Sequence, residues 1–253
     1  MFFLISVALF ALGAIIASFI GVVVARLHTG ESFLKGRSRC DACATKLTSR
    51  QLVPIFSFVA WGARARCCGS RLSLAEPISE LLLGALFVLA YATLGLSPAL
   101  TLFFIALSLL LALVRYDLAH HVLPFPLLAF FVAVAALYGF SRAPAPDVFL
   151  HSLRIAMLLG LLLAAIHALS RGRAMGLADA PLAFGLALLV GPAALPGFLF
   201  SFWVGAVIGI FILFQRPAGS RMGVEVPFAP FLAAGFLLAH FTQWNPFIFG
   251  IRF

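Results

Sequence analysis

Two aspartates, Asp117 and Asp179, are the side chains of this sequence best placed to do chemistry. The chain has only eight acidic residues, and five of them fall in predicted loops or turns, which leaves these two and Glu80 within or beside apolar runs. Ionisable groups in or beside lipid are costly, so they usually face a cavity or a partner and mark function. Asp117 follows one apolar run and Asp179 opens another, so both are expected at one membrane depth.

Two carboxylates at one depth on neighbouring helices can share a proton, because like charges in close contact cannot both ionise. An aspartyl protease needs this arrangement: the ionised member deprotonates a water, and the protonated member stabilises the oxyanion and then protonates the leaving amine. Alternatively, each aspartate caps a helix or pairs with Arg115 or Arg173. A proton or cation relay in a transporter would instead need carboxylates at the membrane midplane on broken helices.

All four cysteines lie in one basic loop and form the second candidate site. Cys40 and Cys43 make a CxxC pair, and Cys67 and Cys68 are adjacent after 23 intervening residues. Two thiolate pairs separated by a loop suit tetrahedral zinc, which would help a small loop to fold. Adjacent cysteines reach one metal only with an unusual backbone, so unmetallated thiols are the alternative.

The elements that must position these residues are membrane helices. The chain is 64% apolar and 10% charged, whereas a soluble domain is about half apolar and about a quarter charged. Apolar runs predict an all-α bundle of about eight transmembrane helices. The sixth run is short and is followed by Gly191 and Pro192, which predicts a tilted or partly re-entrant helix. The predicted helices cover residues 2–25, 77–96, 99–116, 122–140, 148–169, 179–194, 197–214 and 227–242.

The net charge of +9 follows from membrane topology rather than from nucleic-acid binding. Nine of the 17 Lys and Arg residues lie between Arg26 and Arg71. Cytoplasmic loops carry such an excess, so this loop is predicted to be cytoplasmic, where disulfides are disfavoured. The predicted organisation is a first helix over 1–25, a basic loop domain with the candidate zinc site over 26–76, and a membrane core over 77–253.

Several segments resemble the type IV prepilin peptidases, which are GxGD-type intramembrane aspartyl peptidases. Residues 175–182, MGLADAPL, look like the GxGD motif, and Tyr116-Asp117-Leu118 with Leu123-Pro124 looks like the family's first aspartate motif. Matches in the same order along the chain extend the resemblance over most of its length. These further segments are 17–27, 76–81 and 226–231.

The resemblance implies that Asp117 and Asp179 are the two catalytic aspartates and that Gly176 is the first glycine of the motif. Ala178 replaces the second glycine, and alanine excludes most positive-φ conformations. Three other positions depart from the family pattern: Gly21 where asparagine is common, Phe125 where an acidic residue is usual, and Ala65 where the third cysteine falls, for which Cys67 is the candidate substitute.

The implied function is cleavage of the basic leader from type IV prepilins or pseudopilins at the cytoplasmic face of a bacterial inner membrane. Glu80 could bind the basic leader or pair with a neighbouring arginine. The resemblance also implies N-methylation of the new N-terminus from S-adenosylmethionine, associated with the cysteine loop. The departures at Ala178, Phe125 and the cysteines leave a noncatalytic or specialised relative as the alternative.

Overall fold

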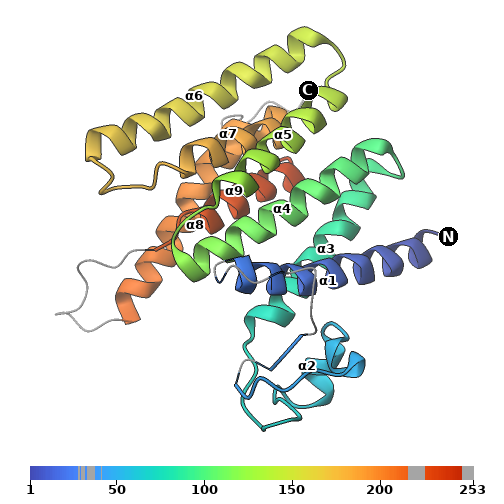
Figure 1. Cartoon of the computed structure of the whole chain (residues 1–253). Helices are drawn as coiled ribbons and strands as arrows, with labels where there is room; N and C mark the ends of the chain where they lie inside the picture. Colours follow the sequence, from blue (N-terminus) through green and yellow to red (C-terminus); the bar gives the residue numbers. More distant parts are fainter. Residues whose placement is uncertain (28, 30–31, 33–37, 41, 216–225, 247–253) are drawn as a thin grey trace. The chain divides into compact units, whose positions relative to one another are not determined.

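The structure is a computed structural model, and it describes residues 1–253 except 28, 30–31, 33–37, 41, 216–225 and 247–253 (Figure 1). The described chain is almost entirely helical, and it forms two compact units, Met1–Arg115 and Tyr116–Phe253. The helices are α1 (Phe2–Leu27), η1 (Ser49–Leu52), α2 (Phe56–Ala60), α3 (Ala75–Leu94), α4 (Pro98–His120), α5 (Phe125–Arg142), α6 (Pro146–Ser170), α7 (Asp179–Val190), η2 (Gly191–Ala193), α8 (Ala194–Gln215) and α9 (Ala229–Thr242).

Each of the predicted apolar runs forms a helix, which confirms the all-α membrane fold. Six stretches are long and apolar enough to cross a membrane: α1, α3, α4, α5, α6 and Asp179–Gln215, which contains α7 and α8. The chain is therefore a multi-pass membrane protein. The orientation of the chain in the membrane stays a prediction. Some of the basic residues from which it was predicted lie outside the described residues: Lys35, Arg37, Arg216, Arg221 and Arg252.

The sixth predicted helix is short, as expected. Helix α7 has 12 residues and ends at Val190, and the next residue, Gly191, has a φ of 57° that suits glycine. Twelve residues rise about 18 Å, less than the hydrocarbon core of about 30 Å. Helix α9 has 14 residues and is also too short to cross by itself in a straight path. The run predicted at 227–242 therefore forms a helix, but this helix is too short to cross the hydrocarbon core by itself.

In the first unit, α1 packs closely on α3 through two glycines. A Cβ atom on Gly13 would lie 2.8 Å from the backbone oxygen of Leu83, and one on Gly84 would lie 2.9 Å from Phe10. Small residues let membrane helices approach in this way. Helix α4 meets α3 where the rings of Phe87 and Phe104 stack with centroids 3.9 Å apart.

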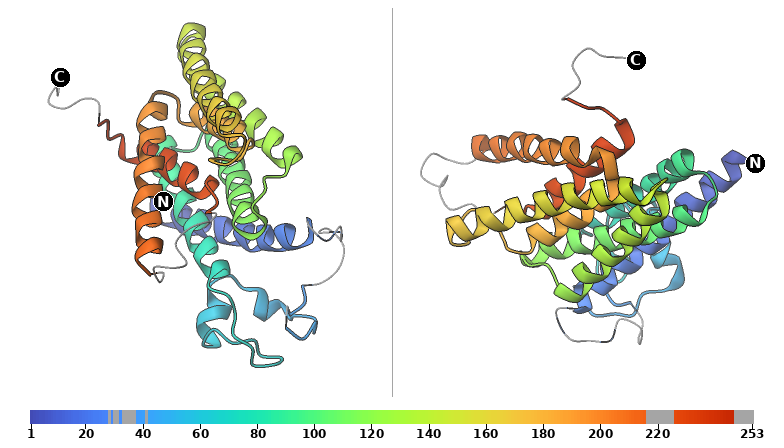
Figure 2. Two further views of the ribbon diagram at one scale, coloured as in Figure 1. Left: turned by 90° about the vertical axis from the view of Figure 1, so that its left-hand side faces the viewer. Right: turned by 90° about the horizontal axis from the view of Figure 1, so that it is seen from above.

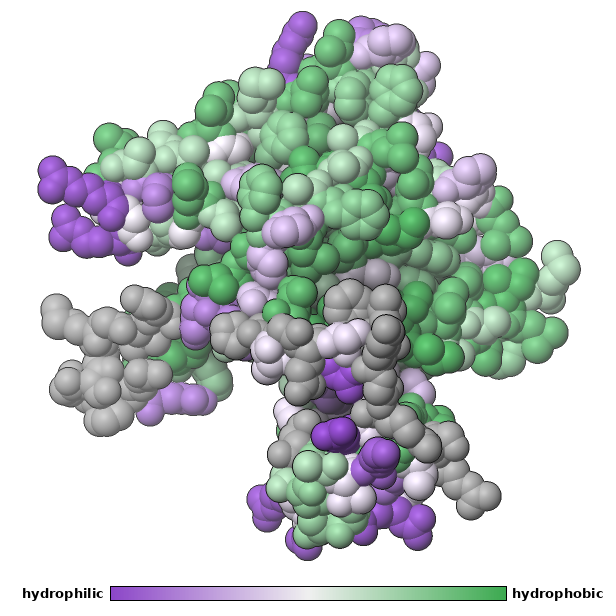
Figure 3. Space-filling view, in the orientation of Figure 1, coloured by the Kyte–Doolittle hydropathy of each residue, from purple (hydrophilic) through white to green (hydrophobic). Residues whose placement is uncertain are grey.

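The segment between α1 and α3 forms a small polar domain outside these helices. Figure 3 shows hydrophilic side chains gathered on this segment and hydrophobic ones over the helices. One contact ties the domain to α3: the backbone N–H of Ile55 donates to Glu80 Oε2 at 2.7 Å. Glu80 is 6% exposed, so its carboxylate holds the loop domain. The suggested role of Glu80 in leader binding stays a prediction.

In the second unit, α7 is the central helix. It contacts α5, α6, α8 and α9, and ten of its 12 residues are buried. Figure 2 shows α6 running beside α7, and α9 lying against α8. A helix that is apolar on all sides is stable only when surrounded, which is the situation of α7. The core of this unit therefore fixes Asp179, the first residue of α7.

Candidate active site and metal site

Asp117 and Asp179 line one cavity of about 750 Å³ within the second unit. Both aspartates are 7% exposed. The cavity wall comes from the C-terminal end of α4, the loop before α7, the middle of α8 and the segment that enters α9. The structure thus brings together the two aspartates that the sequence analysis singled out, and both lie at helix ends rather than in mid-helix.

Asp117 is held by the start of α9. Its Oδ2 atom accepts a hydrogen bond from the backbone N–H of Ala229 at 3.3 Å. Ala229 is the first residue of α9, and N–H groups there have no partner within their own helix. The segment 226–231, which the sequence singles out only by its resemblance to the peptidase family, therefore positions Asp117. His121 also lines the cavity, and its backbone N–H donates to the Asp117 carbonyl at 2.8 Å.

Asp179 is positioned by the loop that precedes it. Its backbone N–H donates to the Gly176 carbonyl at 3.3 Å. His167 Nδ1 lies 2.9 Å from the Met175 carbonyl, which fixes the loop on the last turns of α6. The sequence does not single out His167, because a histidine in an apolar run carries no signal of a loop partner eight residues away.

The structure supports only part of the alternative in which each aspartate caps a helix or pairs with an arginine. Arg115 forms a two-point ion pair with Glu76, and its Nη1 also donates to Ser79 Oγ at 3.1 Å. Arg173 lines the cavity, but no ion pair joins it to another described residue. Asp117 does cap α9, although its carboxylate also lines the cavity. These contacts leave both carboxyl groups with access to the same space.

The four cysteine sulfur atoms lie within 4.8 Å of one another in the first unit. Cys43 Sγ is 3.3 Å from Cys67 Sγ, and Cys40 Sγ is 3.8 Å from Cys68 Sγ. Tetrahedral zinc with Zn–S bonds of about 2.3 Å requires sulfur atoms about 3.8 Å apart. The donor set and its spacing therefore fit a zinc ion.

Two turns with the same hydrogen-bond pattern hold these sulfurs. In the first, Cys40 N–H donates to the Thr45 carbonyl at 2.9 Å, and Ala44 N–H donates to the Cys40 carbonyl at 2.8 Å. In the second, Ala65 N–H donates to the Ser70 carbonyl at 2.8 Å, and Gly69 N–H donates to the Ala65 carbonyl at 2.7 Å. Ala65 of the second turn thus corresponds to Cys40 of the first turn, so the second turn has no thiol at this position. Cys67, which lies within the second turn, supplies the fourth thiol of the cluster instead.

Hydrogen bonds set different pKa values in the cluster. The hydroxyl and backbone N–H of Thr45 lower the pKa of Cys43 to about 6. The backbone N–H groups of Cys43 and Ala42 lower the pKa of Cys40. Contacts with the sulfurs of Cys43 and Cys40 raise the pKa of Cys67 to about 12. Ionising all four thiols therefore requires a cation among them, which favours metal binding.

Comparison with known proteins identifies the family of this chain. The sequence profile of the Bacterial Peptidase A24 N-terminal domain matches residues 11–94. The prepilin leader peptidase/N-methyltransferase of Bacillus subtilis (strain 168) is 31% identical over 92% of this chain and 92% of its own length. The chain belongs to the prepilin leader peptidase/N-methyltransferase family.

Two further members of the prepilin leader peptidase/N-methyltransferase family show how far the similarity extends. The protein of Myxococcus xanthus (strain DK1622) is 38% identical over 48% of this chain, but only 36% of that protein is covered. The protein of Dickeya chrysanthemi is 29% identical over 89% of this chain and 88% of its own length. No solved structure matches the chain.

The departures from the family pattern have local structural explanations. Phe125 is 77% exposed at the start of α5 and does not line the cavity with the aspartates. Gly21 faces Glu76, and a Cβ atom there would lie 2.5 Å from Glu76 Oε2. An asparagine at position 21 would therefore displace the ion pair between Glu76 and Arg115.

Ala178 is compatible with the local backbone. Its φ and ψ are −69° and −17°, in the right-handed helical region, so glycine's freedom is not needed here. We expect Ala178→Gly to leave the rate of peptide cleavage within about threefold of wild type, because alanine and glycine both adopt this backbone conformation without strain. Single-turnover cleavage kinetics would measure this.

Gly176→Ala is the contrasting variant. A Cβ atom at position 176 would lie 3.4 Å from Asp179 Oδ2 and would cover one side of the carboxylate. We expect cleavage to fall about tenfold or more, because the added methyl group would stand beside the Asp179 carboxylate and restrict the approach of the reacting groups. Equal loss in Ala178→Gly and Gly176→Ala would contradict this account of the motif.

The matching geometry of the two turns predicts that the third thiol of the cluster can be moved from position 67 to position 65. In the double variant Ala65→Cys/Cys67→Ala, a cysteine would stand where Cys40 stands in the first turn. We expect the variant to bind one zinc with affinity equal to or greater than wild type, because four thiolates are retained. Cys67→Ala alone has three thiols and should bind zinc more weakly. Competition with a chromogenic chelator would rank the three proteins, and weak binding by the double variant would refute the equivalence.

Proposed function

We propose that this protein is a membrane-embedded aspartic endopeptidase that removes the basic leader from type IV prepilins or pseudopilins. The observation that carries this proposal is the pair of buried carboxyl groups, Asp117 and Asp179, at helix ends on one cavity of about 750 Å³. The names of the related proteins give the substrate class: each is a prepilin leader peptidase/N-methyltransferase.

In the proposed mechanism, the two carboxyl groups share one proton. The ionised aspartate takes a proton from a water, which attacks the scissile carbonyl carbon, while the protonated aspartate donates a hydrogen bond to the oxyanion. A proton then passes to the leaving amine as the C–N bond breaks. The Ala229 N–H bond to Asp117 favours its ionised form, so Asp117 suits the role of base and Asp179 that of acid.

The cavity is suited to a substrate with an apolar segment beside the cleavage site. Phe202, Phe228 and Phe231 form part of its wall. A pilin precursor joins a basic leader to a hydrophobic helix, and positive charge holds such a leader on the cytoplasmic side. The proposed location is therefore the bacterial inner membrane, with cleavage near its cytoplasmic face.

Zinc is the proposed structural cofactor of the loop domain. Cys40, Cys43, Cys67 and Cys68 would hold it, and the ion would supply the cross-link that a small polar loop needs to fold. No proton transfer of the proposed cleavage involves these cysteines.

N-methylation of the new N-terminus with S-adenosylmethionine is a second proposed activity, and it rests on the names of the relatives. Among the described residues, the cavity of the loop domain, about 170 Å³, is lined by Arg39, Arg64, Arg66 and Arg71 and by no acidic side chain.

The experiment that tests the peptidase proposal uses the full chain reconstituted in liposomes with prepilin-like and pseudopilin-like substrates. Mass spectrometry of the products should show a single cut between the basic leader and the apolar segment. Failure to cut any of several such substrates would favour a noncatalytic relative. Methyl transfer is read in the same products as a mass increase that depends on added S-adenosylmethionine.

A further inference from the structure

The loop domain carries a short helix with apolar side chains that the described residues of the first unit leave exposed. Ser57 of α2 and the following Trp61 line the loop cavity. Phe56 and Val59 lie three residues apart on another side of the helix and are 64% and 72% exposed. Exposed large apolar side chains gathered in this way mark a binding surface. The α2 apolar face consists of Leu52, Val53, Phe56 and Val59.

A hydrogen bond fixes this face at the level of the first turns of α3. Ile55, the residue before α2, donates its backbone N–H to Glu80 Oε2 at 2.7 Å. Glu80 lies five residues beyond Ala75, the start of α3, which is about 8 Å along the helix axis. Interfacial helices bury their apolar face about 5–10 Å into the boundary between headgroups and acyl chains.

The backbone at Ile55 supports a fixed position for α2. Its φ and ψ are 60° and −50°, which is unusual for a β-branched residue and persists only where the surroundings enforce it. Beside this contact, α3 exposes Ile78 and Leu81, at 57% and 48%. A helix that crosses a membrane presents such residues to lipid, so the α2 apolar face lies at the depth where lipid begins.

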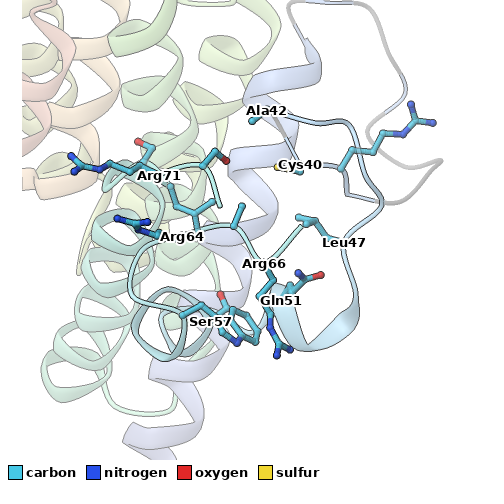
Figure 4. A pocket seen from close by; sticks show the side chains of 14 residues that line it. Cys40, Ala42, Leu47, Gln51, Ser57, Arg64, Arg66 and Arg71 are labelled. Atoms are coloured by element: carbon cyan, nitrogen blue, oxygen red, sulfur yellow. The ribbon is translucent and has the colours of Figure 1, made fainter. Parts of the chain in front are cut away.

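Three arginines of the loop domain line the same cavity as Ser57 of α2 and Trp61. Arg64, Arg66 and Arg71 are exposed, line the cavity of the loop domain (Figure 4) and form no ion pair with any described residue. Arg64 stands opposite Arg71 in an antiparallel bridge, and like charges in that position repel. The Arg66 guanidinium lies 5.4 Å from the centre of the Trp61 ring. Anionic groups among these arginines would relieve the repulsion.

We propose that the α2 apolar face and these three arginines dock the loop domain on an anionic lipid surface. Phe56 and Val59 insert among the acyl chains, and the arginines bind headgroup phosphates. The segment joins two membrane-spanning helices, so the lipid surface is always within reach. A free phosphate could satisfy the arginines but would leave the apolar side chains exposed to water.

The test places a photo-crosslinking amino acid at position 59 of the full chain in nanodiscs. We expect lipid adducts by mass spectrometry, with a yield roughly threefold or more higher in phosphatidylglycerol than in phosphatidylcholine. The triple variant Arg64→Gln/Arg66→Gln/Arg71→Gln should lose this preference. The corresponding triple lysine variant is the matched control and should keep it, because charge rather than guanidinium shape draws the surface to anionic lipid.

Absence of lipid adducts would overturn the proposal, as would equal yields in the two lipids for the unsubstituted arginines. Adducts to a co-reconstituted prepilin substrate in place of lipid would reassign the face to protein binding. An unchanged preference in the glutamine variant would refute the role of the arginines. Elution volume and circular dichroism verify that each variant is folded, so loss of the signal cannot be attributed to unfolding. Cleavage activity is not part of the readout, and the outcome is therefore independent of the peptidase proposal.

Discussion

Asp117→Asn and Asp179→Asn are each expected to lower the rate of prepilin cleavage by at least about 10³-fold, the scale of general acid–base catalysis. Asparagine has nearly the same size as aspartate but can neither accept the proton of the attacking water nor return one to the leaving amine. Both side chains are buried on the same cavity, so no bulk solvent group replaces them. Single-turnover cleavage in liposomes, followed by mass spectrometry, gives the rates.

A matched control exists within the same unit. Asp147 is an exposed aspartate in the first turn of α6, and it does not line the cavity. Asp147→Asn makes the same chemical change away from the aspartate pair and should cleave at the wild-type rate. Cleavage that persists in either cavity variant would rule out the assigned pair, and a similar loss in Asp147→Asn would point to destabilisation instead.

Cys40→Ser is expected to lower zinc affinity by at least about 100-fold and to remove the hydrogen-exchange protection of the loop domain. Cys40 is the buried member of the cluster, and structural zinc supplies folding free energy directly because the site forms only with the fold. Serine keeps the size of the side chain but is a poor zinc ligand. Metal analysis gives the zinc content, and hydrogen-exchange mass spectrometry reports on residues 38–74.

Lys46→Gln is the control for the cysteine variant, because it changes an exposed residue of the same turn and leaves all four thiols in place. It should retain zinc and protection. Full protection in Cys40→Ser, or in wild type stripped by a chelator, would show that the loop domain folds without metal. Wild-type protein purified without zinc but with a protected loop would favour the alternative of unmetallated thiols.

The sequence by itself determined the membrane class, the positions of the helices and the identity of the candidate residues. Composition and apolar runs suffice for this, because the hydrocarbon core demands long apolar helices whatever their packing. Asp117 and Asp179 could be singled out because a charged side chain is rare in such runs. The spacing of Cys40 and Cys43 likewise signals a metal turn without reference to any partner.

Only the tertiary structure decided how these residues are held. That Ala229 binds Asp117 depends on two segments separated by 112 positions in the chain, and no local pattern encodes such a contact. The resemblance already placed Ala65 at the third cysteine position, and only the backbone hydrogen bonds show that its turn matches the turn of Cys40. The bond from Ile55 to Glu80 likewise joins residues that are 25 positions apart in the chain. Local periodicity reports which side of a helix is apolar, whereas the partner of a polar group is fixed by how distant segments pack.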